Sequence, residues 1–130
     1  MLLAVLVSAA IATQAYTPQP GSPERSAILE ALRPSIEAQL GPNVEFVIKD
    51  LQVYRGWAFV MADPQRKGGG KIDGRRYLPD SYDIGGLETT AVLRYQKGRW
   101  RLVQSAIGAT DVWYCHLGPQ QIHAYCPPAE

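Results

Sequence analysis

The side chains best suited to chemistry gather in the last sixteen residues of the chain. Cys115, His116, His123 and Cys126 could together ligate zinc or copper. However, the order Cys-His, six residues, His, two residues, Cys matches no usual structural zinc spacing. A disulfide between Cys115 and Cys126 is therefore the favoured interpretation, with a metal site or a cysteine nucleophile as alternatives. We expect no cofactor.

A glycine-rich loop concentrates positive charge in the middle of the chain. Residues 66–77 hold five of the thirteen basic residues against the single acid Asp73. The Gly-Gly-Gly-Lys run is not a P-loop, because Ile72 stands where Ser or Thr should bind the metal. A solvated loop is the simpler interpretation. The more specific hypothesis is that the loop is a basic arm that binds an acidic protein or an anionic envelope surface.

Aromatic side chains extend the candidate binding set. Five of them, Tyr77, Tyr82, Trp113, Tyr114 and Tyr125, fall in predicted loops or the tail, where they suit protein or sugar recognition or simple packing. Those on predicted strands, Trp57, Phe59 and Trp100, are expected in the core. The predicted binding residues are Arg66, Lys67, Lys71, Arg75, Arg76, Tyr77, Trp113 and His116. No carboxylate stands in a recognisable catalytic motif, so we assign no catalytic or metal residue.

A helix is predicted over residues 23–40. Ser22 can cap its first turn, and Pro23 suits the first helical position. One apolar stripe recurs every fourth residue, at Ile28, Leu32, Ile36 and Leu40. Pro34 predicts a kink or a division into two helices. Residues 41–43, Gly-Pro-Asn, end the element.

Four strands are predicted after the helix. The first begins at Val44 and changes parity at a bulge near Lys49-Asp50. The second runs over residues 57–62 and is expected to stop at Asp63-Pro64, and a long irregular region spans residues 65–86. Two further strands, about 87–96 and 99–107, form a hairpin. In the last strand, Trp100, Leu102 and Ala106 are expected to share one face.

This order predicts the α+β class, with one N-terminal helix packed on a four-stranded antiparallel sheet. The long loop lies between the second and third strands. A single sheet face would be buried, against the helix. No internal repeat is present.

The first fifteen residues predict a signal peptide. They carry no charge, and an apolar run from Leu2 to Ile11 precedes the small-x-small site Thr13-Gln14-Ala15. A buried N-terminal helix is the alternative. Residues 16–21 would then be a linker and residues 22–130 one domain, periplasmic or secreted, with no membrane span. A net charge of only +1 argues against a nucleic-acid binder.

Several stretches resemble a family of small uncharacterised exported bacterial proteins. They are Ser22-Pro23-Glu24-Arg25, residues 27–33, residues 56–60, Gly98-Arg99-Trp100-Arg101 and residues 106–112. The helix-then-strands order also resembles cystatin-like domains, and the closing tryptophan-bearing hairpin resembles nuclear-transport-factor-2-like domains. These resemblances imply a fold and no particular activity.

The leading functional prediction is a non-catalytic binding or accessory domain of the periplasm. Two alternatives stay open: a small hydrolase or isomerase with a cavity between helix and sheet, and a metal-handling protein that uses the Cys/His tail. The expected partner is a protein or an anionic envelope component.

Overall fold

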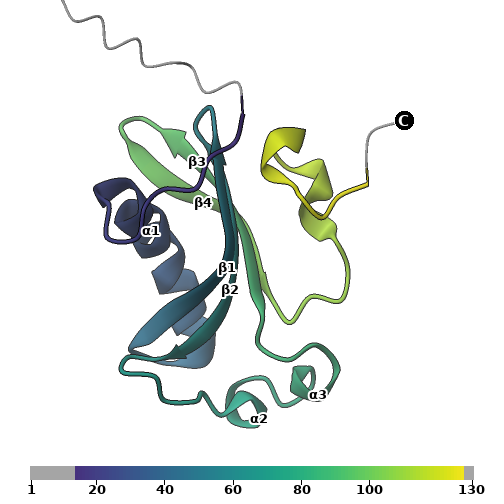
Figure 1. The fold of residues 1–130 in the computed structure, drawn as a ribbon. Coiled ribbons are helices and arrows are strands. Elements are labelled where there is room, and N and C mark those ends of the chain that lie inside the picture. Colours follow the sequence, from purple (N-terminus) through teal and green to yellow (C-terminus); the bar gives the residue numbers. More distant parts are fainter. Residues whose placement is uncertain (1–13, 128–130) are drawn as a thin grey trace, which may run out of the picture.

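The order of elements is that of the sequence prediction, in a computed structural model that describes residues 14–127 (Figure 1). Helix α1 (Pro23–Leu40) precedes strands β1 (Val44–Tyr54), β2 (Trp57–Arg66), β3 (Thr89–Gln96) and β4 (Arg99–Ile107). The strands form one antiparallel sheet in the order β1-β2-β3-β4. The α+β class is therefore confirmed. The predicted signal peptide lies, up to residue 13, outside the described residues.

Helix α1 has the bounds that its capping residues predict. The Ser22 hydroxyl accepts a hydrogen bond from the Arg25 N–H at 3.2 Å. The four residues of the apolar stripe are fully buried against the sheet. The division of the helix at Pro34 was wrong, because the helix is one continuous element. Pro34 is exposed, so its ring leaves the packing of the buried stripe intact on both sides.

The strands confirm the predicted bulge and correct two other expectations. The register between β1 and β2 shifts between Ile48 and Asp50, which leaves Lys49 as the extra residue. Strand β2 continues through Pro64 to Arg66, because β3 pairs with β2 only up to Ala62 and a proline is tolerated at a free edge. In β4 a second bulge at Val103 reverses the alternation, so Ala106 no longer shares a face with Leu102.

The region predicted to be irregular contains two short helices, α2 (Gly74–Tyr77) and α3 (Tyr82–Gly85). They pack closely, since a Cβ at Gly74 would lie 2.1 Å from the Tyr82 ring. Tyr77 in turn packs against Gly41 at the end of α1. The loop is therefore a folded segment at the end of the sheet opposite the two hairpin turns (Figure 1).

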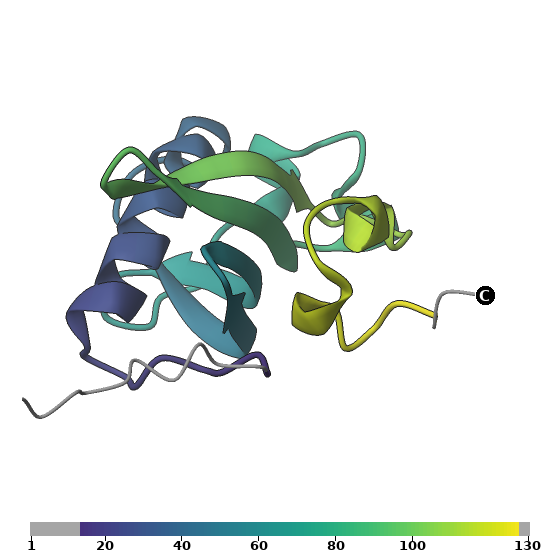
Figure 2. The ribbon, with the colours of Figure 1, turned by 90° about the horizontal axis from the view of Figure 1, so that it is seen from above.

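Both faces of the sheet are covered, whereas the sequence predicted one buried face. Helix α1 covers the first face, and the C-terminal segment covers the second (Figure 2). That segment forms two 3-10 turns, η1 (Trp113–His116) and η2 (Gln120–Ile122). Its Tyr114 and Ile122 are buried with Phe59 and Val92 in a second apolar cluster. The tail is thus an integral third layer.

The predicted linker, residues 16–21, begins on the outer edge of β1. Tyr16 and Val53 exchange two backbone hydrogen bonds of 2.9 and 2.8 Å. The Thr17 hydroxyl donates to the Leu51 carbonyl at 2.7 Å, and Pro18 is buried. These contacts attach the segment to the sheet just before α1 begins.

Candidate functional site

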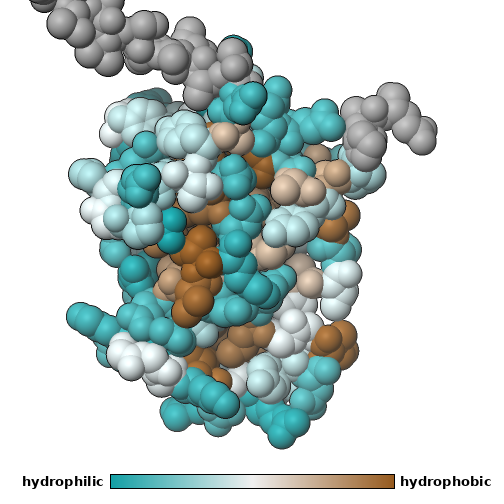
Figure 3. Space-filling model, in the orientation of Figure 1, coloured by the Kyte–Doolittle hydropathy of each residue, from teal (hydrophilic) through white to brown (hydrophobic). Residues whose placement is uncertain are grey.

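A groove lies between the first half of α1 and the turn end of the sheet. Its volume is about 760 Å³, within the range of small-molecule sites. In Figure 3 the most hydrophobic surface lies in the middle of the face, below the turn end, and is bordered by hydrophilic side chains. Ala27, Ala31, Val53, Tyr95 and Trp100 supply the apolar wall. Gly56 and Gly98, from the two hairpin turns, line its end.

Small residues on the helix and large aromatics on the sheet create this groove. Ala27 and Ala31 stand one turn apart, so α1 offers no bulky side chain there. Tyr95 and Trp100 are directly opposite each other on β3 and β4. Their ring centroids lie 5.5 Å apart with an interplanar angle of 68°, an edge-to-face pair. Half of the Tyr95 surface is exposed, so the pair keeps apolar surface open to a ligand.

The rim of the groove carries a phenol–carboxylate pair. The Tyr16 hydroxyl donates to Glu24 Oε1 at 2.6 Å. Partial burial raises the pKa of Tyr16 to about 12, and the hydrogen bond and negative charge of Glu24 act in the same direction. Glu30, also on the rim, accepts a hydrogen bond from Arg33 Nε at 3.1 Å. The rim therefore offers hydrogen-bonding groups to a polar head that sits above the apolar wall.

The lining of the groove suits binding better than catalysis. None of its residues is a Ser, Thr, Cys, His, Asp or Lys, so it offers no nucleophile–base pair. Both of its carboxylates, Glu24 and Glu30, are engaged by neighbours. The remaining charged group, Arg99, has no ion pair within residues 14–127. Apolar contact, with a few polar groups to orient the ligand, is what this arrangement provides.

The predicted basic residues of the loop have different partners in the structure. The Arg66 guanidinium donates to the carbonyls of Pro42 and Leu40, at 2.9 and 2.5 Å, and lies over the Tyr77 ring. Arg75 is paired with Asp83 at 3.0 Å.

The other cations of the loop lie at its surface. Lys67, Lys71 and Arg76 are exposed, and Arg76 stacks on the same Tyr77 ring. Arg66 and Tyr77 thus hold the loop to the end of α1, and only part of the predicted arm remains free.

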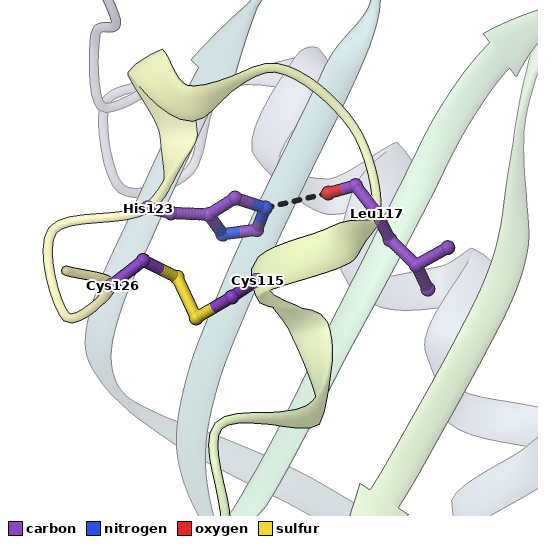
Figure 4. Close-up of a disulfide and its surroundings, with 4 residues drawn as sticks. All are labelled: Cys115, Leu117, His123 and Cys126. Carbon is purple, nitrogen blue, oxygen red and sulfur yellow. Dashed lines mark hydrogen bonds between the residues drawn. A yellow bond between two sulfur atoms is a disulfide. The ribbon is translucent and has the colours of Figure 1, made fainter. Parts of the chain in front are cut away.

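The disulfide prediction is confirmed, with Cys115 and Cys126 joined at a Cα–Cα distance of 5.6 Å (Figure 4). The two thiols therefore supply no thiolate ligand in this state. Within residues 14–127, no group of three or more His, Cys, Asp or Glu side chains is placed to hold a metal ion. The bond links the end of η1 to the chain beyond η2 and closes the tail over the second sheet face.

The two tail histidines have different surroundings. His123 is only 6% exposed and packs against Phe59 and Tyr114, with ring centroids 5.5 and 5.6 Å away. Its Nε2–H donates to the Leu117 carbonyl, as Figure 4 shows. His116 is exposed and lines a small hollow beside the disulfide together with His123.

Two aromatic residues of the tail, Trp113 and Tyr114, pack against the second sheet face. The Trp113 indole N–H donates to the Thr90 hydroxyl at 3.0 Å. Burial raises the pKa of Tyr114, and the nearby charges of Glu88, Tyr125 and Asp50 add to this. Tyr114 is only 3% exposed, so it belongs to the second cluster and not to a recognition surface.

The sequence analysis did not single out the groove residues. It assigned no binding role to Ala27 or Ala31, and it predicted Trp100 to lie in the core. The sequence signal for the groove is the pair of small residues Ala27 and Ala31 beside the apolar stripe. The aromatic residues Tyr95 and Trp100 on either side of the β3–β4 turn add to it. No helix of the described residues is long and apolar enough to cross a membrane. The chain matches no family model, and no curated protein or solved structure is similar to it at a significant level.

Proposed function

We propose that this chain is a non-catalytic binding domain of an exported protein, and that it seats a small apolar molecule with a polar head in the groove beside α1. The observation that carries the proposal is the apolar wall of Tyr95, Trp100, Ala27 and Ala31. The apolar part of the ligand would cover the edge of the Tyr95–Trp100 pair. Its polar head would meet Glu24, Glu30 or Arg99 at the rim.

Export is supported by the compartment that the disulfide requires. Disulfides persist in oxidising compartments and are rare in the cytosol. Cys115 and Cys126 close a tail that forms one of the three layers of the fold. An oxidising location would therefore serve folding itself, which agrees with the signal peptide predicted over residues 1–15.

A hydrolase or isomerase with its site between helix and sheet would use the same groove. Its reactive groups would be Glu24 and the Tyr16 phenol, because these two lie within hydrogen-bond distance of each other on the rim. The raised pKa of Tyr16 keeps the phenol protonated and unsuited to act as a base near neutral pH. Binding without chemistry is therefore the function that the groove supports best.

The test is binding of the neutral dye Nile red, whose fluorescence rises in apolar surroundings. The purified chain should enhance the emission of the dye in a saturable manner. Ala27→Phe should abolish this enhancement by filling the groove. Ala38→Phe, at another exposed alanine of α1 outside the groove, should leave it unchanged.

Both variants place a phenylalanine at the helix surface, so their melting curves should be alike. This control separates loss of the groove from loss of the fold. No enhancement by the wild-type chain, or equal enhancement by Ala27→Phe and the wild type, would contradict the proposal.

A further inference from the structure

Besides Arg99, which lines the groove, four cations gather at the turn end of the sheet, in a group that we call the turn-end patch: Arg55, Arg94, Lys97 and Arg101. Arg55 occupies the β1–β2 turn, Lys97 occupies the β3–β4 turn, and the two others stand on β3 and β4. The two hairpins are adjacent there, since the Tyr95 N–H donates to the Gly56 carbonyl at 2.7 Å. Residues 51–62 and 89–110, which build this end, contain no acidic residue.

The patch lacks the ion pairs that neutralise cations elsewhere in the molecule. Arg33 pairs with Glu30, and Lys49 pairs with both Asp63 and Glu88. Within residues 14–127, no member of the turn-end patch has an acidic side chain within ion-pair distance. The positive charge of this end is therefore available to a partner, although the net charge of the chain is only +1.

Two of the cations face each other directly. Arg94 and Arg101 are cross-strand partners on β3 and β4. Like charges at directly opposite positions destabilise a sheet, so the pair works against the fold on its own. In addition, the Nε of Arg101 is buried and has no hydrogen-bond partner among the described residues. An incoming anion would relieve the repulsion and could accept from these donors.

The guanidinium groups are oriented by aromatic rings. The Arg94 Cζ lies 4.8 Å from the centroid of the Trp57 ring, and the Arg55 Cζ lies 5.3 Å from that of Tyr54. Stacking on a ring leaves the edge of a guanidinium, with its donors, free for a carboxylate. Arginines held in this way are suited to bidentate recognition of planar anions.

The turns themselves carry cations at positions where a bulky side chain is unfavourable. Arg55 and Lys97 have φ values of 45° and 53°, and glycines with φ of 78° and 80° follow them. Hairpin turns of this kind favour Asn, Asp or Gly at the first central position. Their occupation by a basic residue in both adjacent hairpins is explained if the charges serve recognition.

The shape of the patch favours a flexible chain over a flat surface. Arg94 and Arg101 form the third cross-strand pair from the turn, so they lie about 7 Å back from the first pair. A bilayer resting on the turns would meet Arg55 and Lys97 first. A polypeptide can run past the turns and along the side of the hairpin, where Gln96, Lys97 and Arg101 line a shallow hollow of about 440 Å³.

The turn-end patch also has a small extent, since it covers only the two hairpin turns and the nearby ends of β3 and β4. Glu24 and Glu30 stand on the rim of the neighbouring groove, where they would repel a long, uniformly charged polymer such as a nucleic acid. We infer that the turn-end patch binds a short acidic segment of a partner polypeptide, whose carboxylates engage Arg94 and Arg101. This site is independent of the groove.

The probe is a fluorescein-labelled hexaglutamate peptide, followed by anisotropy at low salt. The double variant Arg94→Gln/Arg101→Gln should bind it at least about tenfold more weakly than the wild type, since two charge-assisted contacts are lost. The control Arg33→Gln/Lys49→Gln removes the same charge from two cations that already have acidic partners elsewhere in the molecule, and it should bind as the wild type does. Added salt should weaken the binding.

Three results would overturn the inference: no binding of the peptide by the wild type, equal weakening in both double variants, or tighter binding of anionic vesicles or a charge-matched oligothymidylate than of the peptide. Melting curves of both double variants check the fold. The groove-filling variant Ala27→Phe should retain peptide binding. The inference and the proposed function can therefore fail separately.

Discussion

The disulfide should stabilise the domain by holding the third layer on the sheet. Cys115 and Cys126 are eleven residues apart, and on the chain-entropy account closing such a loop contributes about 3 kcal/mol to the free energy of unfolding. For a domain of this size, the double variant Cys115→Ser/Cys126→Ser should melt about 10 °C below the wild type. Thermal unfolding followed by circular dichroism, with the wild type in oxidised and reduced form, measures this loss.

The reduced wild type should have the same melting temperature as the double variant. A reducing agent should not change the melting temperature of the double variant. Tyr114 and Ile122 pack on the sheet from within or beside the closed loop, so part of the loss reflects their detachment. A loss of less than about 1 kcal/mol would refute the view that the tail is held to the sheet by this bond.

Two further predictions test the packing and the electrostatics. Phe59→Ala should lower the free energy of unfolding in urea by about 3–5 kcal/mol, because Phe59 is fully buried in the second cluster. The control is Val103→Ala, at an exposed position, and an equally small loss in both variants would contradict this prediction. In an absorbance titration, Tyr16 should ionise near pH 12, and Glu24→Gln should lower its pKa towards 10.0. Since the folded pKa is raised, the contribution of Tyr16 to stability is present below pH 10 and is lost as the pH rises towards 12; an unchanged pKa in Glu24→Gln would contradict the role of Glu24.

The main elements of the fold could be predicted from local signals. Helix α1 follows from Ser22, Pro23 and the stripe of buried residues at every fourth position. The bulge at Lys49 follows from the change of parity in β1. In each case a few neighbouring residues determine the backbone conformation, so the sequence pattern is sufficient.

The sequence predictions were wrong where contacts between segments distant in the sequence determine the structure. Strand β2 continues through Pro64 because the pairing of β2 with β3 stops at the Ala62–Thr89 pair. Only the register of the sheet shows this. The bulge at Val103 leaves no signal in the alternation of a half-exposed strand. The second covered face was missed because an apolar strand residue such as Phe59 predicts burial without indicating which segment packs on it.

The candidate sites were missed for a related reason. The groove depends on how α1 crosses the hairpin turns, and neither Ala27 nor Trp100 indicates this alone. The basic loop was the more conspicuous charge cluster in the sequence. Its Arg66 and Arg75 are nevertheless bound to carbonyls or a carboxylate of the fold, whereas Arg94 and Arg101 of the turn-end patch have no acidic partner among the described residues. The long interval without an acid, residues 89–110, was the readable signal.

The groove can be tested most directly with the three tryptophan indoles, which report three places in the molecule. Trp100 lines the groove, whereas Trp57 and Trp113 pack with the second cluster. In a nitrogen–proton correlation spectrum titrated with Nile red, the account predicts a saturable shift of the Trp100 indole signal, with the other two unmoved. Shifts confined to Trp57 or Trp113, or no shift at all, would contradict it.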